Sequence, residues 1–292
     1  MTVMVTGASG VIGRALIPLL VERDEVRACV RGEESAEGLR ALGAKVAVGR
    51  LDDVDAFAEV LRRVYTVVHL VGGPNQSDDD AILAANHRSV VTALSAARHA
   101  GVARFVFVSV PGASVDASHP YLRAKGLGEE AVENSGLEYA VVRPTHVYGL
   151  GGLWFTAVVE GASATPPFVV GDGTQRVAPV IVDDIAAVLA AIDDRDAGIE
   201  GTWAIEGPDV VEAAELVALL AQDSTPPVPL DPDEAAVRLT ASFGRPVSPS
   251  AAAFFAMPSR ADAPDAAAQF GVVRTALDEG MRRTLERAAL GR

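Results

Sequence analysis

Residues 6–13 read TGASGVIG and follow a short apolar run, Val3–Val5, that has the composition of a β-strand. Gly7 permits a tight turn at the end of that strand, Gly10 lets a phosphate group approach bare backbone, and Gly13 lets the next helix pack close to the sheet. The free N–H groups and the dipole of a helix N-terminus favour an anion. The stretch therefore predicts a dinucleotide site; the alternative is a tight structural turn without a ligand.

Short β-branched runs alternate with helical stretches through the first half of the chain. Strict alternation predicts an α/β fold of Rossmann type, a doubly wound parallel sheet with helices on both faces. Continuously apolar runs such as VVHLV are typical of buried parallel strands. Strands are expected at 3–5, 26–30, 46–48, 66–71, 104–109 and 138–142, and helices at 11–21, 33–42, 54–64, 78–100 and 121–135.

The pattern loosens after Pro144, where glycines and prolines interrupt it. We expect residues 1–150 to form the dinucleotide-binding core and residues 151–292 to form a smaller, mostly helical, mainly substrate-binding part. Segments near 180–206, with a helix at 182–192 and a strand at 202–205, are expected to return to the core. The stretch 223–232 holds four prolines and is expected to be a loop.

Composition narrows the classes of partner. The formal net charge is −14 and aromatic residues make up 5% of the chain, so neither a basic footprint nor stacking platforms for nucleic acid are expected. No apolar run approaches the roughly 18 residues of a membrane span, and no basic leader precedes the first strand. Cys29 is the single cysteine, so no internal disulfide and no Cys/His metal site are expected. We expect a cytoplasmic protein.

Tyr121 and Lys125 lie four residues apart in YLRAK, at the start of an expected helix. This spacing places both side chains on one helix face. An ammonium group beside a phenol is expected to lower the pKa of the phenol, which suits a general acid or base for an alcohol–carbonyl pair. The alternative is an exposed pair on a helix surface.

Six motifs occur in a fixed order: TGASGVIG, Asp52 after the third strand, FVFVSV at 105–110, YLRAK, RPTHVYG at 143–149 and VIVDDIA at 180–186. Together they resemble the short-chain dehydrogenase/reductase superfamily, over about residues 1–220. The resemblance is greatest to its extended and atypical branches, which include epimerase/dehydratase-like, NmrA-like and complex-I-accessory-like groups.

The resemblance implies that Tyr121 is the catalytic acid or base, and that Lys125 holds the cofactor ribose and lowers the pKa of Tyr121. It also implies that Asn86 contacts backbone near the active site. It assigns cofactor binding to the phosphate loop (Gly7, Ser9, Gly10, Val11, Ile12, Gly13), to the ends of the third and fourth strands (Leu51, Asp52, Val71, Gly72) and to the loop beside the nicotinamide (Pro144, Thr145, His146, Val147).

One position departs from the family pattern. Active members place a hydroxyl just after the fifth strand to bind the substrate oxygen, whereas this chain reads Ser109–Val110–Pro111. The expected hydroxyl position is Val110, although Ser109 serves if the register shifts, and Ser114 is a more distant candidate. A missing donor costs about 10²- to 10³-fold in rate, by analogy with an oxyanion hole.

Arg31 ends the second strand, where a carboxylate would bind a ribose 2′-hydroxyl. A guanidinium suits a 2′-phosphate, which favours NADP over NAD. Alternatively, Arg31 is merely exposed or stacks on the adenine of NAD. The substrate side is expected to include His119, Trp154, Phe155 and Arg176.

These observations favour an NAD(P)-dependent oxidoreductase that moves a hydride to or from a small carbonyl or alcohol substrate. Two alternatives stay open: an NAD(P)-binding regulator or assembly protein with little catalysis, and a sugar-nucleotide epimerase or dehydratase, for which Arg176 is the main argument. The helices at 78–100 and 121–135 are candidates to pair in a homodimer. His69 is expected to be a core residue, and Asp183 and Asp184 are expected to cap a helix.

Overall fold

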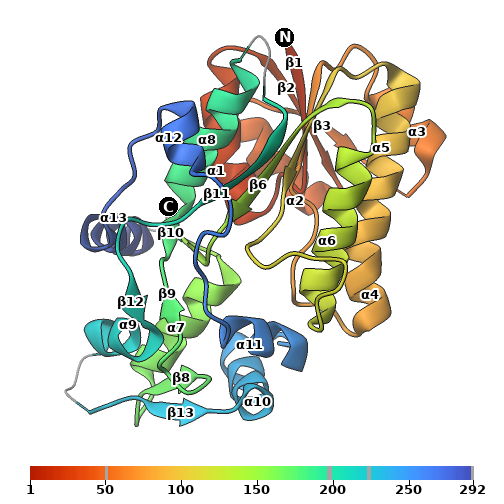
Figure 1. Cartoon of the computed structure of the whole chain (residues 1–292). Coiled ribbons are helices and arrows are strands. Elements are labelled where there is room, and N and C mark those ends of the chain that lie inside the picture. Colours follow the sequence, from red (N-terminus) through yellow and green to blue (C-terminus); the bar gives the residue numbers. More distant parts are fainter. Residues whose placement is uncertain (50–51, 196–198, 222–224, 291–292) are drawn as a thin grey trace.

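The computed structural model describes residues 1–49, 52–195, 199–221 and 225–290. Its centre is a seven-stranded sheet in the order β11-β6-β5-β4-β1-β2-β3, with every neighbouring pair parallel (Figure 1). The predicted Rossmann-type fold is confirmed. The strands are β1 (Thr2–Thr6), β2 (Glu25–Val30), β3 (Lys45–Val48), β4 (Thr66–His69), β5 (Arg104–Val108), β6 (Glu138–Pro144) and β11 (Gly201–Ile205).

Helices cover both faces of this sheet because its strands are apolar on both sides. Buried side chains of α1 (Val11–Val21), α2 (Glu33–Ala41) and α8 (Val182–Asp193) form one core with the sheet. Those of α3 (Val54–Val60), α5 (Ser89–Ala100) and α6 (Pro120–Glu133) form a second core on the opposite face. The active edge of such a sheet lies at the carboxyl ends of its strands.

The single helix expected at 78–100 is divided in three. It runs as α4 (Asp79–Leu83), a π-helical turn (Ala84–Arg88) and α5. A π turn carries an extra residue and rotates the following side chains, and such turns are frequent at functional sites. Asn86 lies inside this turn and is fully buried.

Most of the remaining elements form a smaller layer beyond the carboxyl edge of the sheet, in the lower part of Figure 1. Their apolar side chains make a separate core. Its helices are α7 (Leu153–Ser163), α9 (Ala213–Leu220), α10 (Pro232–Phe243), α11 (Pro249–Phe255) and α13 (Leu277–Ala289). Short strands connect them: β7 (Val147–Tyr148), β8 (Phe168–Val170), β9 (Arg176–Val177), β10 (Val180–Ile181), β12 (Val211–Glu212) and β13 (Val228–Leu230). Helix α12 (Ala266–Phe270) packs instead beside α8 and β11, in the core of the large sheet.

The expectation of a loop at 223–232 is wrong for its second half; residues 222–224 lie outside the described part. Strand β13 pairs in parallel with β8, with Pro229 opposite Val169. A proline is tolerated because each strand of a two-stranded sheet is an edge. Asp231 then caps α10 by accepting hydrogen bonds from the N–H groups of Asp233 and Glu234, and Pro232 starts the helix.

The expectation that Asp183 and Asp184 cap α8 is also wrong. The cap position is Ile181, and no side chain caps the helix. Asp184 instead accepts hydrogen bonds from Thr275 N (2.7 Å) and Thr275 Oγ1 (2.8 Å), while Asp183 pairs with Arg287 of α13 at 2.8 Å. Long-range partners thus compete successfully with the local cap. None of the helices described is long and apolar enough to cross a membrane.

Candidate functional site

The loop at residues 6–13 has the shape that its glycines predict. Gly7 has φ +66°, and a Cβ added there would lie 2.8 Å from the Leu70 carbonyl carbon at the end of β4. A Cβ on Gly13 would lie 2.4 Å from Ala8 O, so only glycine allows α1 to start this close to the loop. The turn is closed by a hydrogen bond from Gly10 N to Gly7 O (3.0 Å).

The N-terminus of α1 fits an anion. No side chain caps it, and its first turn contains no acidic residue. The first N–H groups of a helix lack partners within the helix, and the dipole adds a partial positive charge. Together with the bare glycines, this end of α1 fits a dinucleotide pyrophosphate.

A cavity of about 400 Å³ begins at this loop and extends across the carboxyl edge of the sheet. Val11 and Ile12 of α1 form one side, and the opposite side comes from α7 and α11. Between them lie residues that follow β4, β5 and β6. The lining includes Gly72, Gly73, Asn75, Gln76, Ser109, Val110, Tyr121, Lys125, Pro144, Thr145, His146, Val147, Trp154, Arg245, Phe254 and Phe255.

Lys125 and Tyr121 both lie on the cavity wall and are both buried. The Lys125 ammonium donates a hydrogen bond to Val108 O (2.8 Å) and lies 4.6 Å from the centre of the Phe107 ring. Burial lowers the pKa of Lys125 to about 7, and the carboxylate of Glu129, one helical turn further along, opposes this shift. Lys125 therefore changes charge near neutral pH.

The pKa of Tyr121 is raised, not lowered as the Tyr–Lys spacing predicted. Burial away from water is the cause, because it disfavours the phenolate. The Lys125 ammonium is bonded to the end of β5, so the expected effect of the nearby cation is outweighed. The Tyr121 ring packs edge-on against Phe254, with 4.9 Å between ring centres. At neutral pH Tyr121 is a protonated phenol.

The hydroxyl groups on the cavity wall differ in their availability. Ser109 Oγ is buried and has no hydrogen-bond partner in the described part of the chain. Thr145 Oγ1 donates to Ala178 O at 2.6 Å. Val110, the expected position of the hydroxyl, lines the cavity with an apolar side chain. Ser109 is thus the serine that the structure places at the wall, and its hydroxyl is uncommitted.

His146 lies in an aromatic setting at the same wall. Its ring stacks on Trp154 at 4.7 Å between centres and meets Phe254 edge-on at 5.2 Å. Burial lowers the pKa of His146 to about 4, although a hydrogen bond with the Met257 backbone opposes the shift. The residue is therefore a neutral imidazole, and it contributes shape and a polar atom rather than charge.

Two asparagines hold the loop that follows β4. Asn86 Oδ1 accepts from Gly73 N (2.8 Å), and its Nδ2 donates to Gly73 O (3.1 Å). The expected contact of Asn86 with backbone near the site is confirmed. Asn75 links the same loop to the segment between α10 and α11: its Nδ2 donates to Pro246 O (3.0 Å), and its Oδ1 accepts from Ser248 N (2.8 Å).

Several predicted site residues lie away from the cavity wall. His119 caps α6: its Nδ1 accepts from Tyr121 N (3.2 Å), and its Nε2 donates to Ser250 O (3.1 Å). Phe155 packs near Tyr148 in the core of the smaller layer, with ring centres 6.1 Å apart. Arg176 is exposed on β9.

Three other residues predicted to bind the cofactor are exposed: Ser9, Arg31 and Asp52. Asp52 is exposed, whereas Leu51 lies outside the described residues. Val71 N would be 2.9 Å from a Cβ on Gly7, so Val71 borders the loop without lining the cavity. Ser9 O accepts a hydrogen bond from Arg14 Nε (3.0 Å). Arg31 is exposed directly after β2, with no hydrogen bond or ion pair to any residue in the described ranges.

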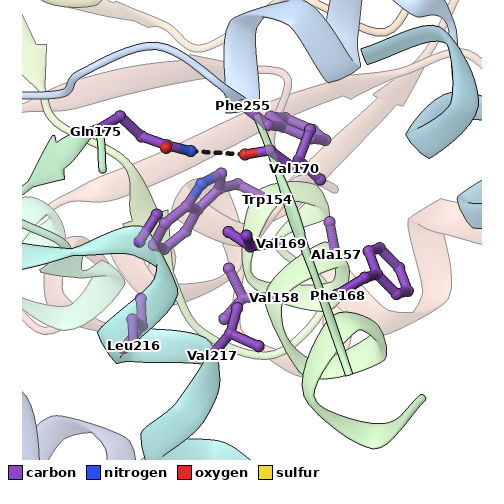
Figure 2. A pocket seen from close by; sticks show the side chains of 11 residues that line it. Trp154, Ala157, Val158, Phe168, Val169, Val170, Gln175, Leu216, Val217 and Phe255 are labelled. Atoms are coloured by element: carbon purple, nitrogen blue, oxygen red, sulfur yellow. Dashed lines mark hydrogen bonds between the residues drawn. The ribbon is translucent and has the colours of Figure 1, made fainter. Parts of the chain in front are cut away.

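A small apolar hollow lies behind Trp154 (Figure 2). Its volume is about 20 Å³, enough for one water molecule, and Trp154 and Phe255 line both this hollow and the main cavity. Gln175 is its polar member: Nε2 donates to Val170 O (2.6 Å), and Oε1 lacks a partner among the described residues. Trp154 is thus a partition between two spaces.

The cavity is also lined by four residues that were not predicted from the sequence: Asn75, Gln76, Arg245 and Phe254. Nothing in the local sequence marks them. They come from loops and a short helix that are far apart in the chain, and Asn75 joins the loop after β4 to the segment before α11 through its hydrogen bonds to Pro246 and Ser248.

The chain belongs to the NAD(P)H-binding family, whose sequence profile matches residues 7–196. It is 32% identical over 228 residues to the mitochondrial NADH dehydrogenase [ubiquinone] 1 alpha subcomplex subunit 9 of Arabidopsis thaliana, covering 74% of this chain and 56% of that protein. The chain therefore spans little more than half the length of this relative.

A ketoreductase of Stigmatella aurantiaca, named for a farnesyl-bearing 3-oxo-dihydroquinoline-1-oxide, is 29% identical over 279 residues and is matched over 87% of this chain and 84% of its own. The fold is also that of a dTDP-glucose 4,6-dehydratase from Streptomyces venezuelae solved with NAD: TM-score 0.73, 20% identity, 98% of this chain and 96% of that one. The resemblance to the extended short-chain dehydrogenase/reductase branch is confirmed, and the chain is an NAD(P)-binding member of an oxidoreductase family.

Proposed function

We propose that this protein is an NADP-dependent reductase of a carbonyl compound, with Tyr121 as the proton donor. The observation that carries the proposal is the position of Tyr121 and Lys125 on the wall of a cavity that begins at the phosphate loop. The raised pKa of Tyr121 keeps its phenol protonated at neutral pH, which is the form needed to give a proton to a carbonyl oxygen. Bound NADPH would supply the hydride.

The chain's own groups have distinct tasks in this proposal. The loop at residues 6–13 and the N-terminus of α1 bind the pyrophosphate, and Lys125 donates to the ribose hydroxyls while keeping its contact with Val108 O. Ser109 donates to the substrate oxygen beside Tyr121, because its buried hydroxyl gains a partner only when a ligand binds. His146 and Thr145 close the nicotinamide side of the cavity.

The preference for NADP rests on Arg31, directly after β2, with Arg14 of α1 as a second candidate. Arg31 is exposed and has no partner in the described part of the chain. Arg14 of α1 reaches α2, the helix that follows Arg31 in the chain: its Nη1 is 3.7 Å from the position of a Cβ on Gly38. Two guanidinium groups suit the doubly charged 2′-phosphate, which NAD lacks.

The proposed substrate is a moderately apolar carbonyl compound. Val110, Leu153, Trp154, Phe254 and Phe255 make the far wall apolar. The ketoreductase relative, whose name carries a farnesyl group and a 3-oxo group, supports this class. Arg176, the residue that favoured a sugar nucleotide, is exposed on β9 and does not line the cavity. Val110 is the observation that keeps a cofactor-binding regulator as the second candidate.

The test is Tyr121→Phe, assayed with NADPH over a panel of aldehydes and ketones. We expect kcat/KM to fall about 10²- to 10⁴-fold, the usual contribution of a general acid, while the Kd for NADPH stays unchanged. Tyr139→Phe is the matched control, because Tyr139 lies on β6 away from the cavity. An unchanged rate in Tyr121→Phe refutes the assigned role. Tight NADPH binding without turnover of any carbonyl by the wild-type protein favours the regulator.

A further inference from the structure

The charges on the cavity wall contrast with those of the whole chain. The chain carries 39 acidic against 25 basic residues, yet the charged residues lining the cavity, among those the structure describes, are both cations, Lys125 and Arg245. Lys125 Nζ already donates to Val108 O. Arg245 has neither a hydrogen bond nor an ion pair with any described residue. Arg245 is an exposed residue of the cavity lining, so its guanidinium meets solvent, and no protein partner has to be displaced when it binds a ligand.

The backbone around Arg245 is held firmly at the cavity edge. Gly244, with φ +61°, ends α10 just before it. The three residues after Arg245 are held by hydrogen bonds. Asn75 bonds to Pro246 O and Ser248 N, and Thr240 Oγ1 accepts from Val247 N (2.8 Å). Because the following three residues are all tied down, the entropy lost when the guanidinium binds a ligand is largely limited to the side chain.

We propose that Arg245 is the anion-binding subsite for the substrate, which is a carbonyl compound bearing a carboxylate or phosphate. This inference rests on the proposed function and adds the substrate's charge to it. A guanidinium binds either anion through two parallel hydrogen bonds. Phe254 packs on Tyr121 and belongs to α11, which follows the Arg245 loop directly. The substrate thus places its apolar body against Phe254 and its anionic group at Arg245.

The test compares benzoylpropionate with its methyl ester, which differ in charge but share the aromatic ketone. In Arg245→Gln we expect kcat/KM for the acid to fall about 10- to 100-fold, the loss expected for a hydrogen bond to a charged group, and that for the ester to change less than about twofold. Arg245→Lys should restore part of the acid's rate. Arg176→Gln is the matched control, because it removes an equal charge from the same layer outside the cavity.

A binding measurement separates this proposal from the reductase proposal. The chain has two tryptophans, so a Trp203→Phe background leaves Trp154 as the single fluorophore, on the cavity wall. Quenching of Trp154 reports probe binding whether or not the probe is reduced. The subsite is supported if the wild-type protein binds the acid more tightly than the ester and Arg245→Gln loses this preference, even if neither probe is reduced. Equal affinities, no saturable binding, or an equal loss of NADPH affinity in Arg245→Gln overturns it.

Discussion

The loop at residues 6–13 and the wall formed by α7 and α11 border the same cavity, but they use different parts of the chain. The loop presents backbone, and its shape depends on two positions where a Cβ would collide with other backbone atoms. The α7–α11 wall presents side chains, chiefly Trp154, Phe254 and Phe255. Steric exclusion therefore leaves almost no freedom to substitute residues in the loop. The side chains of the wall can be substituted without moving the helices that carry them.

The sharpest test of this contrast is Gly13→Ala. The new methyl group would lie 2.4 Å from Ala8 O, so α1 or the loop must move. We expect a loss of stability of about 1–3 kcal/mol from overpacking and a roughly 100-fold weaker NADPH affinity. Thermal unfolding and fluorescence titration measure both. Gly32→Ala is the control, because no atom lies within 4 Å of a Cβ there. Wild-type behaviour of Gly13→Ala would show that the loop is looser than its geometry indicates.

Arg31→Gln tests whether a side chain adds discrimination to the backbone site. We expect the Kd for NADPH to rise about tenfold or more, as when a hydrogen bond to a charged group is lost, with the Kd for NADH unchanged. Arg14→Gln should show the same pattern more weakly. Arg98→Gln, on exposed α5 surface, is the control. Equal losses for both cofactors, or none, would remove Arg31 as the selector.

Trp154→Leu tests the other side of the comparison. The smaller side chain opens the partition between the cavity and the hollow of Figure 2. We expect kcat/KM for methyl ketones of increasing chain length to gain about fourfold for each methylene that enters the hollow, since burying a CH₂ contributes about 0.8 kcal/mol. NADPH affinity should stay the same. Trp203→Phe, which alters the tryptophan packed on Phe270, should leave the length profile unchanged. If the dependence of kcat/KM on chain length is the same in Trp154→Leu as in the wild-type protein, Trp154 does not separate the two spaces.

The smallest expected effect is a pH dependence of NADPH affinity that arises from Lys125. Lys125 has a pKa of about 7, so it is charged below pH 7 and loses its proton above it. The ammonium is the better donor to ribose hydroxyls, and NADPH affinity should therefore fall by a few-fold as pH rises through 7. Lys125→Met should bind NADPH more weakly and with a flat profile; an unchanged slope in this variant would assign the titration to another group.

The same pKa predicts the sign of a stability effect. Between pH 7 and about 10.5 the unfolded chain keeps the Lys125 proton that the folded protein releases, so the free energy of unfolding contributed by this group rises with pH. Below pH 7 the folded protein must bury the ammonium. Denaturant unfolding of wild type and Lys125→Met at pH 6 and pH 8.5 should show a difference that narrows at the higher pH.

The sheet and the phosphate loop were predictable because their signals are local. Alternation of apolar runs set the strands, and three glycines at fixed offsets set the turn. The errors arose where distant partners intervened. Pro229 was expected in a loop but lies in a strand, because β8 provides an edge with which it pairs. Asp184 was expected to cap α8 but accepts hydrogen bonds from Thr275 instead. Asn86 was placed near the site from the family resemblance, but the π turn that carries it was not foreseen.

The sequence alone determined that this chain forms a parallel sheet and that its first strand is followed by a dinucleotide-binding loop. Turn geometry and strand periodicity depend on neighbouring residues, which the sequence specifies. Only the tertiary structure decided the protonation of Tyr121 and which side chains share its cavity. Burial raised the pKa of that phenol against the expected influence of Lys125. The packing of the segment around α11 against the loop after β4 and against Tyr121 brought Arg245 and Phe254 to the cavity. Desolvation and long-range packing depend on what surrounds a residue in space, which spacing along the chain does not specify.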